Sequence, residues 1–130
     1  MDREGLRPDA FEAACRSQQS QVLYTIPTLQ NPTARTMSES RRAHIANLAQ
    51  QYNIWLVEDD IYAFLYDKPP TPLAGFVPER TLYIDGMSKS LAPGLRFGCL
   101  ITPSCASRPH QTRHAGHVLD DSPHHRRDGL

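Results

Sequence analysis

The sequence predicts an α/β fold with a mostly parallel sheet, on two observations. Short apolar runs rich in β-forming residues recur along the chain, separated by stretches with helical periodicity or turn residues. Polar residues follow several of these runs directly, as they do at the carboxyl ends of strands in open α/β sheets. The predicted strands are residues 22–26, 54–57, 81–84 and 97–102. The first three are expected to be buried.

A helix is predicted ahead of the first strand. Pro8 and Asp9 suit its first turn, because proline needs no donor there and an acid meets the positive end of the helix dipole. Phe11, Ala14 and Cys15 then fall on one face, which we expect to pack against the sheet.

A longer helix is predicted between the first two strands. Its apolar stripe consists of Ile45, Leu48, Ala49 and Tyr52. Thr36 or Ser38 is expected to cap it, and Thr36 with Glu39 fits a capping box. The polar residues Arg41, Arg42 and His44 are predicted to lie at the surface.

Composition limits what the chain can be. Its 130 residues can form one domain with a hydrophobic core, and the formal net charge of zero gives no basic excess for nucleic-acid binding. No apolar stretch is long enough to cross a membrane, and the first residues lack a signal-peptide pattern. Cys15, Cys99 and Cys105 lack metal-ligand spacing and indicate reduced thiols of a cytoplasmic protein.

The segment of residues 85–98 carries the clearest chemical signal. Lys89 follows the third predicted strand, and Arg96 lies seven residues later, beyond a Pro-Gly turn. A lysine held in a cleft has a lowered pKa and a lone pair free to attack a carbonyl. An arginine can hold a phosphate through two parallel hydrogen bonds. The pair suits pyridoxal phosphate, an aldehyde that carries a phosphate. Taken alone, however, the pair is better explained by a solvated lysine beside a loop arginine.

Two other predicted strands end in polar residues suited to a ligand. Asn31 precedes Pro32 in the loop after the first strand, where it either aims its amide at a ligand or simply forms a turn. Glu58, Asp59 and Asp60 end the second strand, where acids either face a ligand or cap a helix.

Together, these stretches resemble the class I and II aminotransferases, the fold-type-I pyridoxal phosphate enzymes. The matching pattern is Asn31-Pro32-Thr33, Asp59-x-x-Tyr62, Ser88-Lys89 and Arg96, in this order. It is most similar to the aminotransferase-like domain of MocR/GntR-type transcription regulators and covers roughly residues 5–103. The resemblance implies part of a three-layer αβα sandwich, the large domain of such an enzyme, with the last strand antiparallel.

The resemblance also implies a role for each matched residue. Lys89 would form a Schiff base with pyridoxal phosphate and act as the catalytic base, and Asp59 would hold a proton on the pyridine nitrogen. Contacts to the ring oxygen are implied for Asn31 and Tyr62, and contacts to the phosphate for Ser88 and Arg96. One departure is Gly86, because many relatives have a phosphate-binding serine or threonine three residues before the lysine.

The pattern stops near Pro103. Residues 1–103 are interpreted as a partial cofactor-binding large domain, and residues 104–130 as a non-homologous, disordered tail. That tail holds five of the six histidines and no aromatic Phe, Tyr or Trp. His110, His114 and His117 are interpreted as incidental, so no metal site is predicted.

Three functions remain open at this stage. The first is a fragment of an amino-acid transaminase, whose intact parent would act on amino-acid and 2-oxo-acid substrates as a homodimer. The second is the ligand-sensing domain of a MocR/GntR-type regulator, and the third is an inactive truncated fragment. No nucleic-acid or membrane contact is expected through this segment, and a cytoplasmic location is expected.

Overall fold

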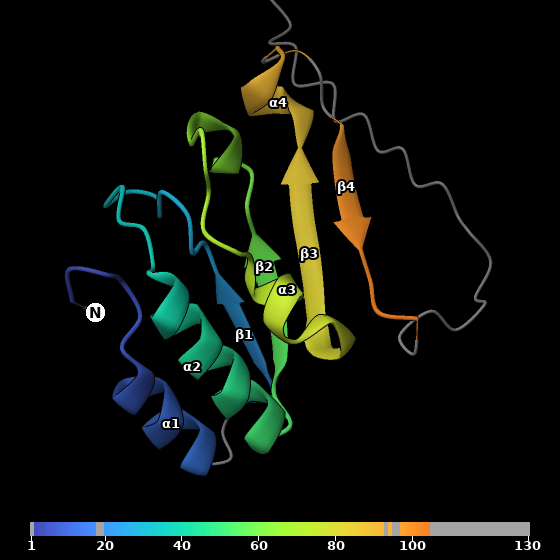
Figure 1. Cartoon of the computed structure of the whole chain (residues 1–130). Helices are drawn as coiled ribbons and strands as arrows, with labels where there is room; N and C mark the ends of the chain where they lie inside the picture. The colour runs from blue at the N-terminus through green and yellow to red at the C-terminus, as the bar shows by residue number, and fades with distance from the viewer. Residues whose placement is uncertain (1, 18–19, 93, 95–96, 105–130) are drawn as a thin grey trace, which may run out of the picture.

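The structure is a computed structural model that describes residues 2–17, 20–92, 94 and 97–104. In these residues, a four-stranded sheet with the order β1-β2-β3-β4 is flanked by helices (Figure 1). Strands β1 (Val22–Thr25), β2 (Trp55–Asp59) and β3 (Thr81–Gly86) are parallel, and β4 (Gly98–Ile101) runs antiparallel to β3. The predicted α/β class is therefore confirmed, including the direction of the last strand.

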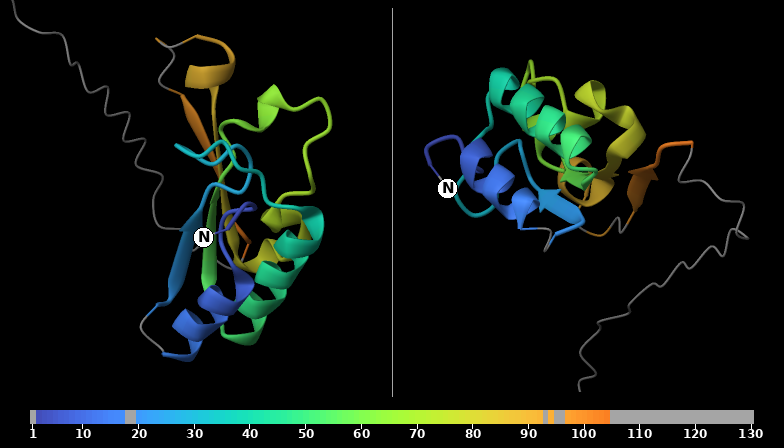
Figure 2. Two further views of the ribbon diagram at one scale, coloured as in Figure 1. Left: turned by 90° about the vertical axis from the view of Figure 1, so that its left-hand side faces the viewer. Right: turned by 90° about the horizontal axis from the view of Figure 1, so that it is seen from below.

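The helices of the described residues lie mainly on one face of the sheet. Helices α1 (Pro8–Arg16), α2 (Glu39–Gln51) and α3 (Leu73–Phe76) cover that face, as the view along the sheet shows (Figure 2). The one-turn helix α4 (Met87–Ser90) continues β3, and the 3₁₀ turns η1 (Ala63–Leu65) and η2 (Pro78–Arg80) flank the segment between β2 and β3. Of the predicted αβα sandwich, the described residues thus build the sheet and one helical layer.

The hydrophobic core lies between this helical layer and the sheet. Ile45 of α2, Leu56 of β2 and Leu73 of α3 are fully buried there, and burying each such side chain stabilises the fold by about 1.5–3 kcal/mol. Phe11 and Cys15 of α1 are buried as predicted, whereas Ala14 is exposed. The other buried apolar residues of this core are Met37, Ala46, Leu48, Ala49, Ile54 and Val77.

The prediction that the strands are buried is wrong for β1. Val22 and Tyr24 are 54% and 57% exposed, whereas Leu23 between them packs on the core. Side chains alternate between the two faces of a strand, so Val22 and Tyr24 lie on the face opposite the three helices. β2 alternates between buried and half-buried residues, and β4 is exposed throughout. In β3, Thr81 is buried, the next three residues are half-buried and Asp85 is exposed, so the third predicted strand is only partly buried.

The start of α2 differs from the predicted one. Ser38 occupies the N-cap position, but its hydroxyl donates to Glu4 Oε2 at 2.8 Å instead of capping the helix. The Thr36 hydroxyl accepts a hydrogen bond from the Leu29 N–H at 3.1 Å, so the capping box with Glu39 does not form. Thr36 also accepts a hydrogen bond from the Tyr66 hydroxyl at 3.0 Å, so both hydroxyls join segments distant in sequence.

The two arginines of α2 were expected at the surface, and for Arg42 this expectation is wrong. Its side chain is fully buried, and its hydrogen bonds are accepted by the carbonyls of Pro27, Met37 and Thr71 and by the Thr28 hydroxyl. Arg41 has a side chain that is 19% exposed and lies between Asp2 and Glu4. His44 is exposed, as predicted.

Candidate functional site

Three segments with predicted site residues meet at one edge of the sheet. The carboxyl ends of β1, β2 and β3 point to the same edge, because the three strands are parallel (Figure 1). The loop of residues 28–36 follows β1, η1 follows β2, and α4 follows β3. Asn31, Tyr62 and Lys89 belong to these three segments, so residues far apart in sequence reach the same end of the molecule.

The loop of residues 28–36 is closed at its base by a ladder of hydrogen bonds. The Met37 N–H donates to the Pro27 carbonyl at 2.8 Å, and the Gln30 N–H donates to the Arg35 carbonyl at 2.8 Å. Asn31 is exposed near the tip of this loop. The loop therefore presents Asn31 from a fixed base.

Asn31 and Tyr62 line a common cavity. Its volume is about 190 Å³, and it opens widely to the surface. Tyr62 comes from the segment after β2, so this cavity joins the exits of β1 and β2. An amide and a phenol on one cavity can together donate hydrogen bonds to a ligand oxygen. The remaining lining residues are Leu29, Gln30, Pro32 and Ala34.

Asp59, the last residue of β2, has a carboxylate that is held at both oxygens. Its Oδ2 accepts a hydrogen bond from the Tyr24 hydroxyl at 2.6 Å, and its Oδ1 accepts one from the Ile61 N–H at 3.3 Å. The hydrogen bond to Asp59 raises the pKa of Tyr24 to about 12. Asp59 is only half-buried, so its carboxylate stays accessible at the edge of the sheet.

The two neighbouring acids have other functions in the fold. Glu58 is fully buried and accepts hydrogen bonds from the N–H groups of Leu73 and Ala74 at 2.8 and 2.9 Å, so it caps the start of α3. This agrees with the helix-capping interpretation, although the capped helix is distant in sequence. Burial raises the pKa of Glu58, and those two N–H donors oppose the rise.

Asp60 is also buried. Its Oδ2 accepts a hydrogen bond from the Tyr83 hydroxyl at 3.1 Å, whereas its Oδ1 has no hydrogen-bond partner among the described residues. Burial, followed by the charge of Asp60, raises the pKa of Tyr83, which keeps this phenol neutral. Asp60 is therefore bonded to β3 through Tyr83.

Lys89 is exposed and Ser88 is half-buried in α4, directly after β3. The register pairs Asp59 with Ile84, so the segment that carries Lys89 leaves the sheet beside the end of β2. Gly86 is extended, and a Cβ there would lie 3.5 Å from the Phe97 carbonyl oxygen, which is ordinary contact. Arg96 lies outside the described residues.

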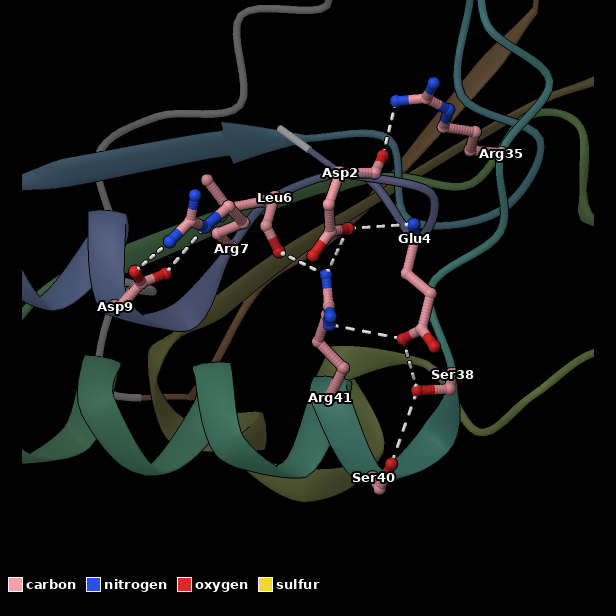
Figure 3. A network of polar contacts seen from close by, with 9 residues as sticks. All are labelled: Asp2, Glu4, Leu6, Arg7, Asp9, Arg35, Ser38, Ser40 and Arg41. Atoms are coloured by element: carbon pink, nitrogen blue, oxygen red, sulfur yellow. Dashed lines mark hydrogen bonds and ion pairs between the residues drawn. The ribbon is translucent and has the colours of Figure 1, made fainter.

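The N-terminal residues are tied to the same loop that carries Asn31 (Figure 3). Arg35 donates to the Asp2 carbonyl, and Arg41 contacts the carboxylates of Asp2 at 2.6 Å and Glu4 at 3.2 Å. The hydrogen bond from Arg41 lowers the pKa of Asp2 to about 2. Gly5 closes the turn between Asp2 and α1 with a φ of 94°, a conformation that favours glycine.

Two larger cavities among the described residues lie away from this edge. One of about 470 Å³ is lined by residues that include Cys15, Tyr52 and Trp55, at the opposite ends of β1 and β2. Another of about 500 Å³ is lined by residues that include Tyr83 and Ile101, beside β4. Neither cavity includes a predicted site residue.

Comparison with known proteins identifies the family. Residues 2–124 match the family model described as aminotransferase class I and II. The chain belongs to this family. The match extends beyond Pro103, and the proposed domain boundary at that residue stays a prediction.

The relatives of this chain include both regulators and enzymes. It is 35% identical over 108 residues to the HTH-type transcriptional regulator YdeF of Bacillus subtilis. The matching region covers 83% of the chain and 23% of YdeF. It is 36% identical over 121 residues to aromatic-amino-acid aminotransferase 1 of Thermococcus litoralis. This matching region covers 87% of the chain and 28% of that enzyme. The chain thus spans about a quarter of the length of these relatives.

A solved structure agrees with the fold. Kynurenine aminotransferase of Pyrococcus horikoshii, in complex with PMP, superposes with a TM-score of 0.74 and 34% identity over 82% of this chain and 28% of that enzyme. The expected fold-type-I architecture is confirmed by this similarity. Among the described residues, no helix is long and apolar enough to span a membrane.

Sequence reasoning missed two residues that organise the edge, Tyr24 and Arg42. Tyr24 lies 35 residues from the carboxylate to which it donates. Strand alternation alone places Tyr24 on one face of β1, but the partner depends on the register with β2. Arg42 stands beside Arg41 in the polar first turns of α2, and nothing in that pattern indicates that one of the two arginines is buried.

Proposed function

We propose that this chain is part of the cofactor-binding domain of a pyridoxal phosphate-dependent aminotransferase. The observation that carries the proposal is the convergence of three strand exits at one edge, where Asp59 ends β2 and Lys89 follows the adjacent parallel strand β3. Family membership and the kinship with aminotransferases support it. In the intact parent, the substrates would be an amino acid and a 2-oxo acid, and the assembly a homodimer.

The residues at this edge fit pyridoxal phosphate chemically. The group, when bound, supplies an electron sink for charge that develops on the substrate. Asp59 offers a carboxylate that can hold a proton on the pyridine nitrogen, because a nearby negative charge favours the protonated ring. Asn31 and Tyr62 line one cavity and offer donors to the ring oxygen.

Lys89 would perform two tasks. Its amine would be the group to which the cofactor is joined, and once released it would move a proton at the substrate's α-carbon as general base. Its exposure at the end of β3 leaves the amine free to reach a ligand at this edge. Ser88 and Arg96 would bind the phosphate, Arg96 through paired hydrogen bonds.

The experiment uses the fact that the chain has only two lysines, Lys68 and Lys89. The full chain is incubated with pyridoxal phosphate, treated with borohydride and digested, and the modified peptides are quantified by mass spectrometry. We expect the adduct on Lys89, its loss in Lys89→Ala and its persistence in Lys68→Ala. Equal labelling of Lys68 and Lys89 would show ordinary surface reactivity and contradict the proposal.

A regulator is the second candidate function, favoured by the similarity to YdeF. In that case the same edge would bind pyridoxal phosphate and sense a ligand without completing transamination. Transfer of the amino group separates the two: conversion of bound pyridoxal phosphate to its amine form by an added amino acid supports the enzyme. Binding without conversion, in a parent completed to the length of its relatives, supports the regulator.

Two further expectations remain proposals. Residues 1–103 would be the folded part of the domain, and residues 104–130 a tail outside it. A cytoplasmic location is consistent with Cys15 and Cys99 both being free thiols.

A further inference from the structure

Arg42 is a fully buried charge with an unusually complete set of acceptors. Its Nε donates to the Met37 carbonyl at 3.0 Å, and its Nη2 donates to the Pro27 carbonyl at 3.1 Å and to Thr28 Oγ1 at 3.0 Å. Its Nη1 reaches the Thr71 carbonyl at 3.5 Å. Burial lowers the pKa of Arg42, so the acceptors around it are what hold the charged form in place.

These acceptors define the base of the loop that carries Asn31. Pro27 precedes the loop, Thr28 begins it and Met37 follows it, so one guanidinium binds both ends. The Pro27 carbonyl also accepts the Met37 N–H at 2.8 Å, which brings the two ends together. The guanidinium is planar and rigid, so it sets the directions of these contacts as well as their strength.

The other side of Arg42 faces the end of β2. Its Nη1 lies 3.9 Å from Oε1 of Glu58, which is also fully buried and precedes Asp59 in sequence. Glu58 in turn accepts the N–H groups of Leu73 and Ala74 and cannot turn away without losing them. Arg42 thus connects the Asn31 loop with the strand residue beside Asp59.

Stability alone is a poor explanation for this arrangement. Replacing a buried ion pair by apolar residues of similar volume is often neutral or stabilising, so such a pair adds little net stability. An apolar side chain cannot donate the hydrogen bonds through which Arg42 holds Pro27, Thr28 and Met37 in fixed directions.

We propose that Arg42 is a positioning residue that fixes the loop of residues 28–36 against the end of β2, and thereby sets where Asn31 lies relative to Asp59. This inference rests on the proposed function for its consequence at the cofactor. The attachment of the loop itself is independent of that function and can be tested without the cofactor.

Thr28→Val is the test variant, because truncating Arg42 itself puts folding at risk. Valine keeps the shape of the fully buried Thr28 and removes only the acceptor for Arg42. Thr81→Val is the matched control, since Thr81 is 2% exposed and its hydroxyl donates to the Val77 carbonyl, away from the site. Thr28→Ser is the rescue variant, because it keeps the hydroxyl.

The first measurement is amide hydrogen exchange of the full chain without cofactor. The Gln30 and Ala34 N–H groups are bonded within the loop and report on its closure. We expect their exchange to be roughly five- to tenfold faster in Thr28→Val, the factor that one lost hydrogen bond gives, and near normal in Thr28→Ser and Thr81→Val. Equal acceleration in the loop and in α2, or none in the loop, would overturn the proposal.

The second measurement is the pH at which the absorbance of bound pyridoxal phosphate changes. A displaced Asn31 donates less well to the anionic ring oxygen of the cofactor. Losing this hydrogen bond disfavours the anion and therefore raises the pKa of that oxygen. We expect the pH midpoint of the absorbance change to be higher in Thr28→Val than in the wild type, and unchanged in Thr81→Val. An unchanged pH midpoint in both variants would overturn the positioning role of Arg42. A wild-type chain that takes up no cofactor contradicts the proposed function alone, and hydrogen exchange then decides the role of Arg42.

Discussion

The hydroxyl of Tyr24 donates a hydrogen bond of 2.6 Å to Oδ2 of Asp59, across neighbouring strands β1 and β2. The contact fixes the carboxylate that we propose to face the cofactor's pyridine nitrogen. It leaves Oδ1 with the Ile61 N–H, so the carboxylate plane is held from two directions. Because Tyr24 is 57% exposed, solvent limits its contribution to stability to about 1 kcal/mol or less.

Tyr24→Phe should reveal this contact through pH dependence. The folded-state pKa of Tyr24 is raised from 10.0 to about 12, so the hydrogen bond stabilises the fold fully below pH 10 and is lost as the pH rises toward 12. The difference in unfolding free energy between wild type and Tyr24→Phe should therefore be constant up to pH 10 and shrink above it. Urea unfolding across that range measures it, and Tyr66→Phe is the control, since Tyr66 bonds Thr36 instead. A difference that does not change above pH 10 would contradict the assignment.

Ala34→Gly should stabilise the chain. Ala34 has a φ of 54°, in the left-handed region that costs an alanine roughly 1–2 kcal/mol. Glycine removes that strain but is more flexible in the unfolded chain, which leaves a net gain of about 0.5–1 kcal/mol. Ala43→Gly in the interior of α2 is the matched control and should lose about 1 kcal/mol. Urea unfolding distinguishes the signs, and a loss at both positions would show that the loop does not need this conformation.

Arg42→Met should destabilise the fold by about 3–5 kcal/mol, because it leaves the buried Glu58 without its partner. Adding Glu58→Gln should recover part of the loss, because glutamine carries no charge. The recovery is incomplete, since the single amide oxygen can replace only one of the two carboxylate oxygens that accept the Leu73 and Ala74 N–H groups. Chemical unfolding of the single and double variants gives the coupling free energy. Strictly additive effects would mean that the two charges act independently across their 3.9 Å separation.

Gly86→Ser should strengthen phosphate binding. An added Cβ would lie 3.5 Å from the Phe97 oxygen and 3.7 Å from Ile61 Cγ2, so the side chain fits without rearrangement. One hydroxyl donated to a charged phosphate should lower the dissociation constant for pyridoxal phosphate about tenfold. Titration by absorbance measures it, and Gly98→Ser is the control, because a Cβ there also fits at 3.6 Å from the Asp85 oxygen. Equal affinity in all three proteins would place the phosphate away from residue 86.

The sequence was sufficient to predict the edge at which Asn31, Asp59, Tyr62 and Lys89 gather. Apolar runs ending in polar residues predict strand exits, and parallel strands bring their carboxyl ends together without any further information. The antiparallel direction of β4 came from the family resemblance and is confirmed. The individual roles of the site residues stay predictions until the labelling and exchange experiments are done.

The burial of Arg42 and the exposure of β1 could not be predicted in the same way. The guanidinium of Arg42 is buried among acceptors from Pro27, Thr28 and Met37, which precede the helix in sequence. Helical periodicity describes only residues within the helix, so it gives no sign of these contacts. Val22 and Tyr24 have the composition of a buried strand, yet the described helices cover only the opposite face. Both outcomes depend on which segments meet in space.

The antiparallel strand β4 reverses the direction of the chain between Lys89 and Gly98. β4 pairs with β3 alone among the described residues and all four of its residues are exposed, so it should be the first strand to separate from the sheet on warming. A molecule attached at Lys89 would lie on the segment that leads from β3 to β4 and should restrain it. Uptake of such a molecule should therefore be visible as delayed exchange of the β4 amides, a signal of occupancy that needs no catalytic turnover.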